Sequence, residues 1–245
     1  MSMNTTIIYI PWFNQLITIV SSCLLYLFIS WIGFKNSKKQ FPNQINEIKK
    51  IWFKISLYFG FCLYLSYLGF LETFKFPPRM PLLSFSITLV SLYLIICSPL
   101  YDLIKYFGKE NLVLFQVWRF IPESIIYTNV FTGIQPSIMT FTGNNFDIIV
   151  PITAPIIYLL FRFKFINTNW ILIWNVVSLL GLLHTLSVGV LSAPYPFQFY
   201  DVHPSNAIVG YFPMTLIPLF FVPLAIICHV LGILLSIKNK IRESN

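Results

Sequence analysis

Hydrophobic residues occur along this chain in long blocks that short polar connectors separate. A transmembrane α-helix needs about 20 mostly apolar residues to cross the hydrocarbon core of a bilayer. We predict seven such spans: 11–34, 51–73, 81–99, 111–131, 146–161, 170–191 and 213–236. The fifth is short and contains Pro151 and Pro155. The pattern therefore predicts an all-α, polytopic membrane helix bundle that forms one integral membrane domain over residues 1–245.

The composition agrees with this class. Of the 245 residues, 57% are hydrophobic and only 10% are charged, whereas a soluble domain carries about 25% charged residues. The sequence contains no HExxH, GxxxxGK[ST] or GxSxG motif, so zinc hydrolysis, nucleotide-driven pumping and α/β-hydrolase chemistry have no support. The four cysteines fall in predicted spans without a CxxC pair. We expect no cofactor and no metal.

The basic residues give an orientation. Short cytoplasmic loops of membrane proteins are enriched in lysine and arginine. Lys75 and Arg79 are the two basic residues on one predicted side, and the opposite side carries twelve: Lys35, Lys38, Lys39, Lys49, Lys50, Lys105, Lys109, Arg162, Lys164, Lys238, Lys240 and Arg242. We therefore predict an outer N-terminus and a cytoplasmic C-terminus in the inner (cytoplasmic) membrane. The net charge of +8 is then a topology signal that also attracts anionic lipids, and no nucleic-acid partner is expected.

The fourth span carries a polar stripe. Gln116, Arg119, Glu123 and Tyr127 fall within about 80° of one another on a helix that turns 100° per residue. Charges at membrane depth usually face a protein interior or a wet cavity and are paired. One interpretation is an Arg119–Glu123 pair that only holds helices together. The other is a polar site lining a cavity, in which these four residues bind substrate or transfer protons.

Further candidates lie near the outer ends of spans five to seven. Asn145 resembles a helix N-cap and Asp147 a first-turn acidic residue, although Asn145 is also a candidate substrate-binding residue and Asp147 a catalytic candidate. On span six, Asn175 shares a face with small residues that favour close helix packing, and it is a further candidate substrate-binding residue. His184 lies on the other side of that span, either as a packing residue or as a proton-transfer group.

The outer segment 192–213 is rich in aromatic residues and proline and contains Gln198, a candidate substrate ligand. A disordered linker would not be this aromatic. We expect the segment to lie over the outer mouth of the bundle, or to form an interfacial aromatic belt.

The second half of the chain resembles a family of uncharacterised bacterial multi-pass membrane proteins over about residues 112–236. The resemblance implies membership without an established activity, and the residues Thr142 and Asn144 are neutral where the family pattern is often charged. The matching residues are Gln116-x-Trp118-Arg119, Glu123, Met139-Thr140-Phe141-x-Gly143-x-Asn145-Phe146-Asp147-Ile148, Thr153-Ala154-Pro155, Trp174-Asn175, Leu191-Ser192-x-Pro194-x-Pro196-Phe197-Gln198, Asn206, Phe212-Pro213, Val222-Pro223 and His229.

Three functions remain open on the sequence. The favoured hypothesis is a membrane-embedded enzyme that uses acid/base chemistry on a lipid-like or isoprenoid-like substrate, with Glu123 as acid or base and Arg119 as a modulator or anion holder. The alternatives are a small carrier or channel for an anionic or proton-coupled solute, and a structural partner of another membrane protein. The expected partners are membrane lipids and a hydrophobic or anionic small molecule.

Overall fold

The computed structural model of the chain describes residues 9–244, which form helices joined by turns and contain no β-strand in that range. The α-helices are α1 (Trp12–Gln40), α2 (Ile45–Tyr67), α3 (Arg79–Ile96), α4 (Pro99–Phe107), α5 (Lys109–Phe115), α6 (Phe120–Phe131), α7 (Ile149–Arg162), α8 (Thr168–Leu191) and α9 (Val222–Ser244). Short 3₁₀ segments are η1 (Pro42–Gln44), η2 (Gln116–Arg119), η3 (Ser137–Met139) and η4 (Asn206–Gly210), and η5 (Ile217–Phe221) is a π-helix.

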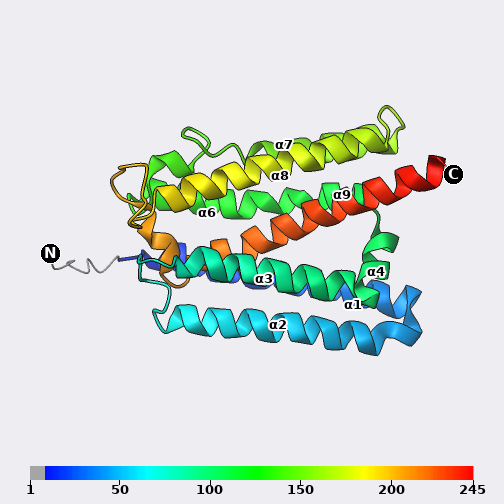
Figure 1. Cartoon of the computed structure of the whole chain (residues 1–245), viewed down its shortest axis with the longest axis horizontal. Coiled ribbons are helices and arrows are strands. Elements are labelled where there is room, and N and C mark those ends of the chain that lie inside the picture. The colour runs from blue at the N-terminus through cyan, green and yellow to red at the C-terminus, as the bar shows by residue number, and fades with distance from the viewer. Residues whose placement is uncertain (1–8, 245) are drawn as a thin grey trace.

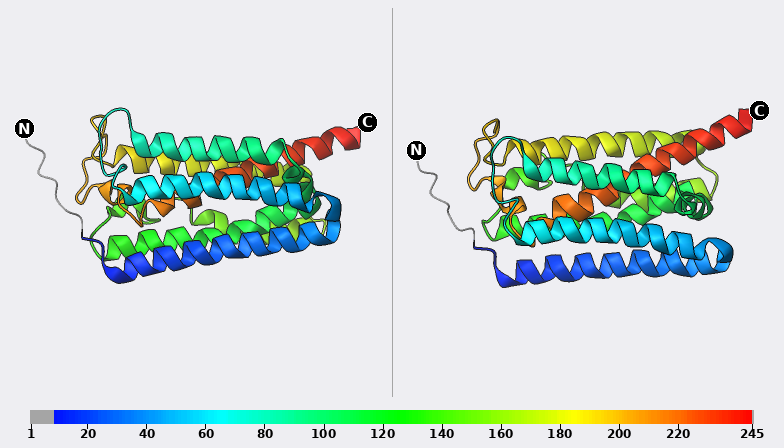
Figure 2. Two further views of the ribbon diagram at one scale, coloured as in Figure 1. Left: turned by 90° about the horizontal axis from the view of Figure 1, so that it is seen from below. Right: turned by 60° about the horizontal axis from the view of Figure 1, so that its bottom comes forward.

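The long helices run side by side along one axis, and the start of the described chain and the C-terminus lie at opposite ends of the bundle (Figure 1). Helix α9 is the central element, because it packs against α3, α5 and α8. Helix α1 lies along one side of the bundle, where it packs against α2 and α6 (Figure 2).

The helices have the apolar length of a membrane protein. Four of the described helical segments are long and apolar enough to cross a bilayer: Trp12–Gln40, Arg79–Ile96, Thr168–Leu191 and Ile217–Lys238. Helix α7 is a shorter apolar helix. Large hydrophobic side chains also cover the outer surface, for example Leu24, Phe53 and Leu180, each more than 60% exposed. Such a surface suits hydrocarbon rather than water.

Six helices, α1 to α3 and α7 to α9, overlap one predicted span each, but several of their ends differ from the prediction. Helices α5 and α6 share the predicted fourth span, and α4 lies almost entirely in a predicted connection. Helix α2 begins six residues before the predicted second span and ends at Tyr67, so 68–73 lies outside it. Helix α7 begins at Ile149, and 146–148 precede it. The predicted N-cap role of Asn145 is wrong. The N-cap position of α7 is Ile148, and no side-chain hydrogen bond caps the helix there.

Two helices that contain proline are irregular in the middle of the bundle. The fourth span is α5, η2 and α6 in series, so the chain tightens to 3₁₀ geometry just before Pro122, which has no N–H to donate. In η5 the backbone N–H of Val222 bonds to the carbonyl of Ile217, five residues back. The same register would pair the Pro218 carbonyl with Pro223, which lacks a donor, and Ser84 of α3 donates its hydroxyl to that carbonyl instead (2.5 Å).

Candidate functional site

The buried Arg119 forms its ion pair with Asp147. Its Nη2 lies 2.5 Å from Asp147 Oδ2, and the two side chains are only 2% and 6% exposed. No such pair joins Arg119 to Glu123 among the described residues. The Arg119–Glu123 ion pair that was one interpretation of the sequence is therefore not formed. Arg119 instead joins η2 to the connection that precedes α7.

A second contact fixes the other side of the guanidinium. Arg119 Nη1 lies 3.1 Å from His229 Nε2, and His229 Nδ1 lies 3.0 Å from Asn175 Oδ1. Because a guanidinium can only donate, Nε2 must accept, and the proton of the imidazole is on Nδ1. Asn175 is compatible with this tautomer, since its Nδ2 donates to the Ile171 carbonyl (2.9 Å) and its oxygen is free to accept. His229 is thus neutral and holds Arg119 in place.

Asn145 links Glu123 to this network. Its Nδ2 donates to Glu123 Oε2 (2.9 Å) and to the Met139 carbonyl (2.9 Å). Its Oδ1 accepts from the Asp147 backbone N–H (2.9 Å) and from Thr185 Oγ1 (3.1 Å). All four hydrogen-bonding positions of this buried amide are occupied. The side chain therefore holds the Glu123 carboxylate and the Asp147 backbone in one arrangement.

The polar stripe turns outward along its length. Gln116 and Arg119 are buried, Glu123 is half-buried and Tyr127 is 52% exposed. The 3₁₀ geometry explains the order, because three residues make one turn there and place Gln116 and Arg119 directly in line. Each four-residue step in α6 then rotates the side chain about 40° further. Tyr127 ends outside the network, where its ring stacks on Phe141.

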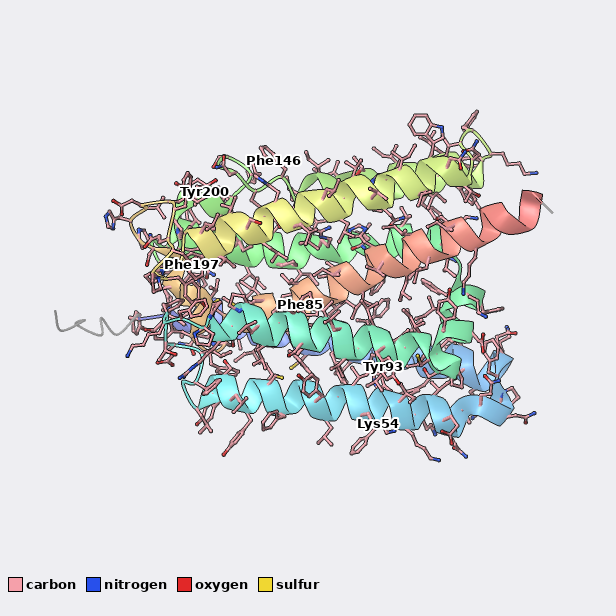
Figure 3. The ribbon with its side chains drawn as sticks, in the orientation of Figure 1. Lys54, Phe85, Tyr93, Phe146, Phe197 and Tyr200 are labelled. Atoms are coloured by element: carbon pink, nitrogen blue, oxygen red, sulfur yellow. The ribbon has the colours of Figure 1, made fainter. Side chains whose placement is uncertain are left out.

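The remaining predicted residues form no hydrogen bond or ion pair with the two carboxylates in the described part of the chain. His184 is exposed and stacks on Phe146. Gln198 donates to the Tyr200 carbonyl (2.8 Å) in the outer segment, and Tyr200 and Phe197 lie at the end of the bundle where the described chain begins (Figure 3). Asn175 supports His229. Gln116 is fully buried, and both its amide nitrogen and its amide oxygen lack a hydrogen-bond partner among the described residues.

The sequence did not predict a buried chain of amides at the end of the bundle where the described chain begins. Asn14 of α1 donates to Asn129 (2.6 Å), Asn129 to Gln135 (3.1 Å) and Gln135 to Asn206 (2.9 Å). Asn206 then donates to the Gly189 carbonyl of α8 (2.9 Å). Asparagines within apolar segments are the available signal, because a buried amide needs partners. The chain ties η4, which belongs to the outer segment, to the interior of the bundle.

A cavity of about 550 Å³ lies beside the charged network. It extends along α3 from Met80 to Leu92, about 18 Å at the rise of an α-helix. Arg119, Glu123 and Asp147 line it, and the rest of its wall is almost entirely apolar. Asn206 and Val209 of η4 also belong to the wall, so part of the segment 192–213 lines this cavity.

The cavity opens sideways between α3 and α8. Both helices pack against α9 and barely against each other. Phe85 and Leu89 of α3 and Leu183 of α8 line the cavity, yet they are 60%, 49% and 46% exposed. Phe85 is labelled on α3 in Figure 3. The mouth is therefore on the apolar flank of the bundle.

A second cavity, of about 250 Å³, lies between α1, α2, α4 and α9. No charged side chain lines it among the described residues. Several hydroxyl groups in its wall are paired internally, as in the Tyr26–Ser56 (2.6 Å) and Trp52–Ser30 (3.1 Å) hydrogen bonds. It offers room for hydrocarbon but no carboxylate, histidine, lysine or arginine from the described residues, so the cavity beside Glu123 is the candidate active site.

Comparisons with known proteins place the chain without naming a reaction. No curated protein and no solved structure shows significant similarity to it. One family model matches residues 78–236, which include every charged side chain of the site and extend further toward the N-terminus than the resemblance seen in the sequence. The chain therefore belongs to the family described as a domain of unknown function, DUF8737.

Proposed function

We propose that this protein is a membrane-embedded enzyme that transfers a proton to and from a lipid-like or isoprenoid-like substrate. The observation that supports this most directly is the environment of Glu123. Its carboxylate lines an apolar cavity and is half-buried, its Oε2 is held by Asn145, and its Oε1 makes no hydrogen bond to any described residue. It is a positioned carboxyl group with one free oxygen.

The two carboxylates then have different roles. Asp147 forms an ion pair with Arg119, so its role is to fix the position of the guanidinium. Glu123 is the proton donor and acceptor, because a carboxyl group in apolar surroundings can retain a proton and deliver it at neutral pH. Delivery to a carbon–carbon double bond gives a carbocation, and loss of a neighbouring proton to the carboxylate completes an isomerisation or cyclisation with no net gain or loss of atoms.

The shape of the cavity supports a lipid-like substrate. Its mouth lies on a flank rich in exposed apolar side chains, so a hydrophobic molecule could enter from the bilayer without crossing water. At the outer end, buried η4 and its amide chain close the bundle. A long apolar wall with a few convergent polar groups is the usual form of a site for a hydrophobic small molecule.

The test uses the purified protein in nanodiscs with a total bacterial lipid extract, incubated in D₂O and analysed by mass spectrometry. The expected result is a lipid species that gains carbon-bound deuterium. Glu123→Gln should abolish this labelling, while the matched surface change Glu47→Gln should leave it intact. Labelling that persists in Glu123→Gln, or no labelled species with the unaltered protein, would contradict the proposal.

We also propose that the bundle crosses the inner membrane seven times with the N-terminus outside. The described part of the chain starts and ends at opposite ends of the bundle, and this and the unequal distribution of basic residues support the proposal. The test starts from a background in which the two exposed cysteines, Cys23 and Cys97, are replaced. A cysteine introduced at Lys75 should react with an impermeant maleimide in spheroplasts. A cysteine introduced at Lys38 should react only after the membrane is permeabilised. The reverse pattern would overturn the orientation.

A proton-coupled carrier is the second candidate. It is favoured by the irregular segments η2 and η5, since residues of both line the cavity and broken helices often form transporter sites. Proteoliposome uptake distinguishes the two functions. A carrier accumulates an unchanged solute in response to a pH gradient, whereas an enzyme labels a lipid in nanodiscs with no gradient.

A further inference from the structure

The charged groups of the cavity leave no spare positive charge. Arg119, Glu123 and Asp147 are the charged side chains that line it in the described part of the chain. The charge of Arg119 is matched by Asp147. His229 adds none, because its Nε2 accepts a hydrogen bond from the guanidinium and its Nδ1 bears the ring proton. The total is zero when Glu123 is protonated and −1 when it is ionised.

Asp147 has a second acceptor that nothing fills. Its Oδ2 takes the ion pair, while its Oδ1 is buried and has no hydrogen-bond partner among the described residues. Buried polar atoms are nearly always satisfied in native proteins. Apart from the ion pair, Arg119 Nη2 also has no hydrogen-bond partner among the described residues, and neither has Trp118 Nε1, so Asp147 Oδ1 adds an acceptor to the site but no net negative charge beyond that of Glu123.

The aromatic side chains of the cavity wall also favour a positively charged ligand. Trp118 and Phe221 line the cavity and stack on each other at 5.8 Å between ring centroids. Phe85 of α3 is a third aromatic side chain in the wall, near the mouth. The faces of aromatic rings attract cations, and most strongly where water is excluded.

We propose that this cavity selects amphiphiles whose head is positively charged, or becomes so during reaction, with the apolar tail lying toward the mouth between α3 and α8. This rests on the proposed function and deepens it by giving the charge class of the substrate. It also replaces the expectation that Arg119 holds an anionic group. The guanidinium is neutralised by Asp147, so an anionic head would meet Glu123 without a free cation to balance it.

The experiment compares three probes with the same tail: dodecyltrimethylammonium, dodecanol and dodecanoate. Each is titrated at low concentration into protein-containing nanodiscs of uncharged phosphatidylcholine, with empty nanodiscs subtracted, and binding is measured by calorimetry. We expect the ammonium to bind tightest, about tenfold or more tighter than dodecanoate. Dodecanoate binding as tightly as the ammonium would overturn the proposal without any variant.

Two variants locate the effect. Glu123→Gln should weaken ammonium binding about tenfold and leave dodecanol binding unchanged. The control Glu47→Gln, at an exposed residue paired with Lys50, should change neither. Thermal unfolding of each variant checks that it is folded. An ammonium preference that survives in Glu123→Gln would contradict the assignment to this cavity.

This inference and the proposed function can fail separately. Deuterium labelling that depends on Glu123, without any preference for the ammonium, would retain the enzyme and reject the charge class. A preference for the ammonium that depends on Glu123, without labelling of any lipid, would reject the enzyme and retain a binding site for cationic amphiphiles.

Discussion

Replacing Asp147 with asparagine should destabilise the protein far more than replacing Glu123 with glutamine. The substituted amide would keep the shape of the side chain and the backbone contact to Asn145, so the change is almost purely electrostatic. It leaves the Arg119 guanidinium, 2% exposed, without its counter-ion. Removing one partner of a buried pair costs about 3–5 kcal/mol of unfolding free energy.

The matched change at Glu123 should cost less than about 1 kcal/mol, because the glutamine oxygen can still accept the hydrogen bond from Asn145. The expected difference also exceeds the roughly 0.6 kcal/mol of an average hydrogen bond between membrane helices. The charge pair, rather than a general loss of polar contacts, therefore decides the result.

The assay is reversible unfolding in mixed micelles of mild and denaturing detergent, followed by tryptophan fluorescence and circular dichroism. Asp147→Asn is measured alone and in an Arg119→Met background, in which its cost should fall below about 1 kcal/mol because no buried charge is then left unpaired. Equal costs in the two backgrounds would refute the ion pair. Equal costs for Asp147→Asn and Glu123→Gln would refute the distinct roles of the two carboxylates.

Two further predictions concern the support of this pair. His229→Leu should lower the unfolding free energy by about 1–3 kcal/mol, because Arg119 Nη1 loses a buried acceptor. His229→Gln should recover part of the loss. The same unfolding titration measures both variants, and equal losses would argue against the contact. Gly232→Ala should cost about 1–3 kcal/mol, because the added Cβ would lie 2.8 Å from Asn175 Oδ1. Gly181→Ala is the control, because a Cβ there meets nothing within 4 Å, and it should be neutral or slightly stabilising. A similar cost at both glycines would show that the close approach of α9 to α8 does not cause the loss of stability at Gly232.

Much of the architecture could be predicted from local sequence. Long apolar blocks specify helices wherever a bilayer replaces water, because the backbone must then satisfy its own hydrogen bonds. The helix positions follow the predicted spans for this reason. The exceptions lie at helix ends: Asp147 and Ile148 form a turn before α7. Asn145 accepts from the Asp147 N–H within this connection and is not the N-cap of the helix.

The candidate site was predicted only in part. The stripe on the fourth span identified Arg119 and Glu123, since a charge in an apolar block is conspicuous on its own. It could not show that Tyr127 would turn outward, because the 3₁₀ geometry of η2 changes the rotation between successive polar residues. The sequence pattern favoured His184 as the proton-transfer histidine of the site, whereas His229 is the histidine that contacts Arg119.

The sequence by itself therefore determined the class of protein, the order of its helices and the presence of charges at membrane depth. Only the tertiary structure decided which carboxylate neutralises Arg119, which histidine supports it and where the cavity opens. The physical reason is that hydrophobic length acts within one helix, whereas an ion pair and a cavity depend on how different helices face one another. That facing is set by the packing of α8 and α3 around α9 and by the local twist of η2 and η5, which no single apolar block encodes.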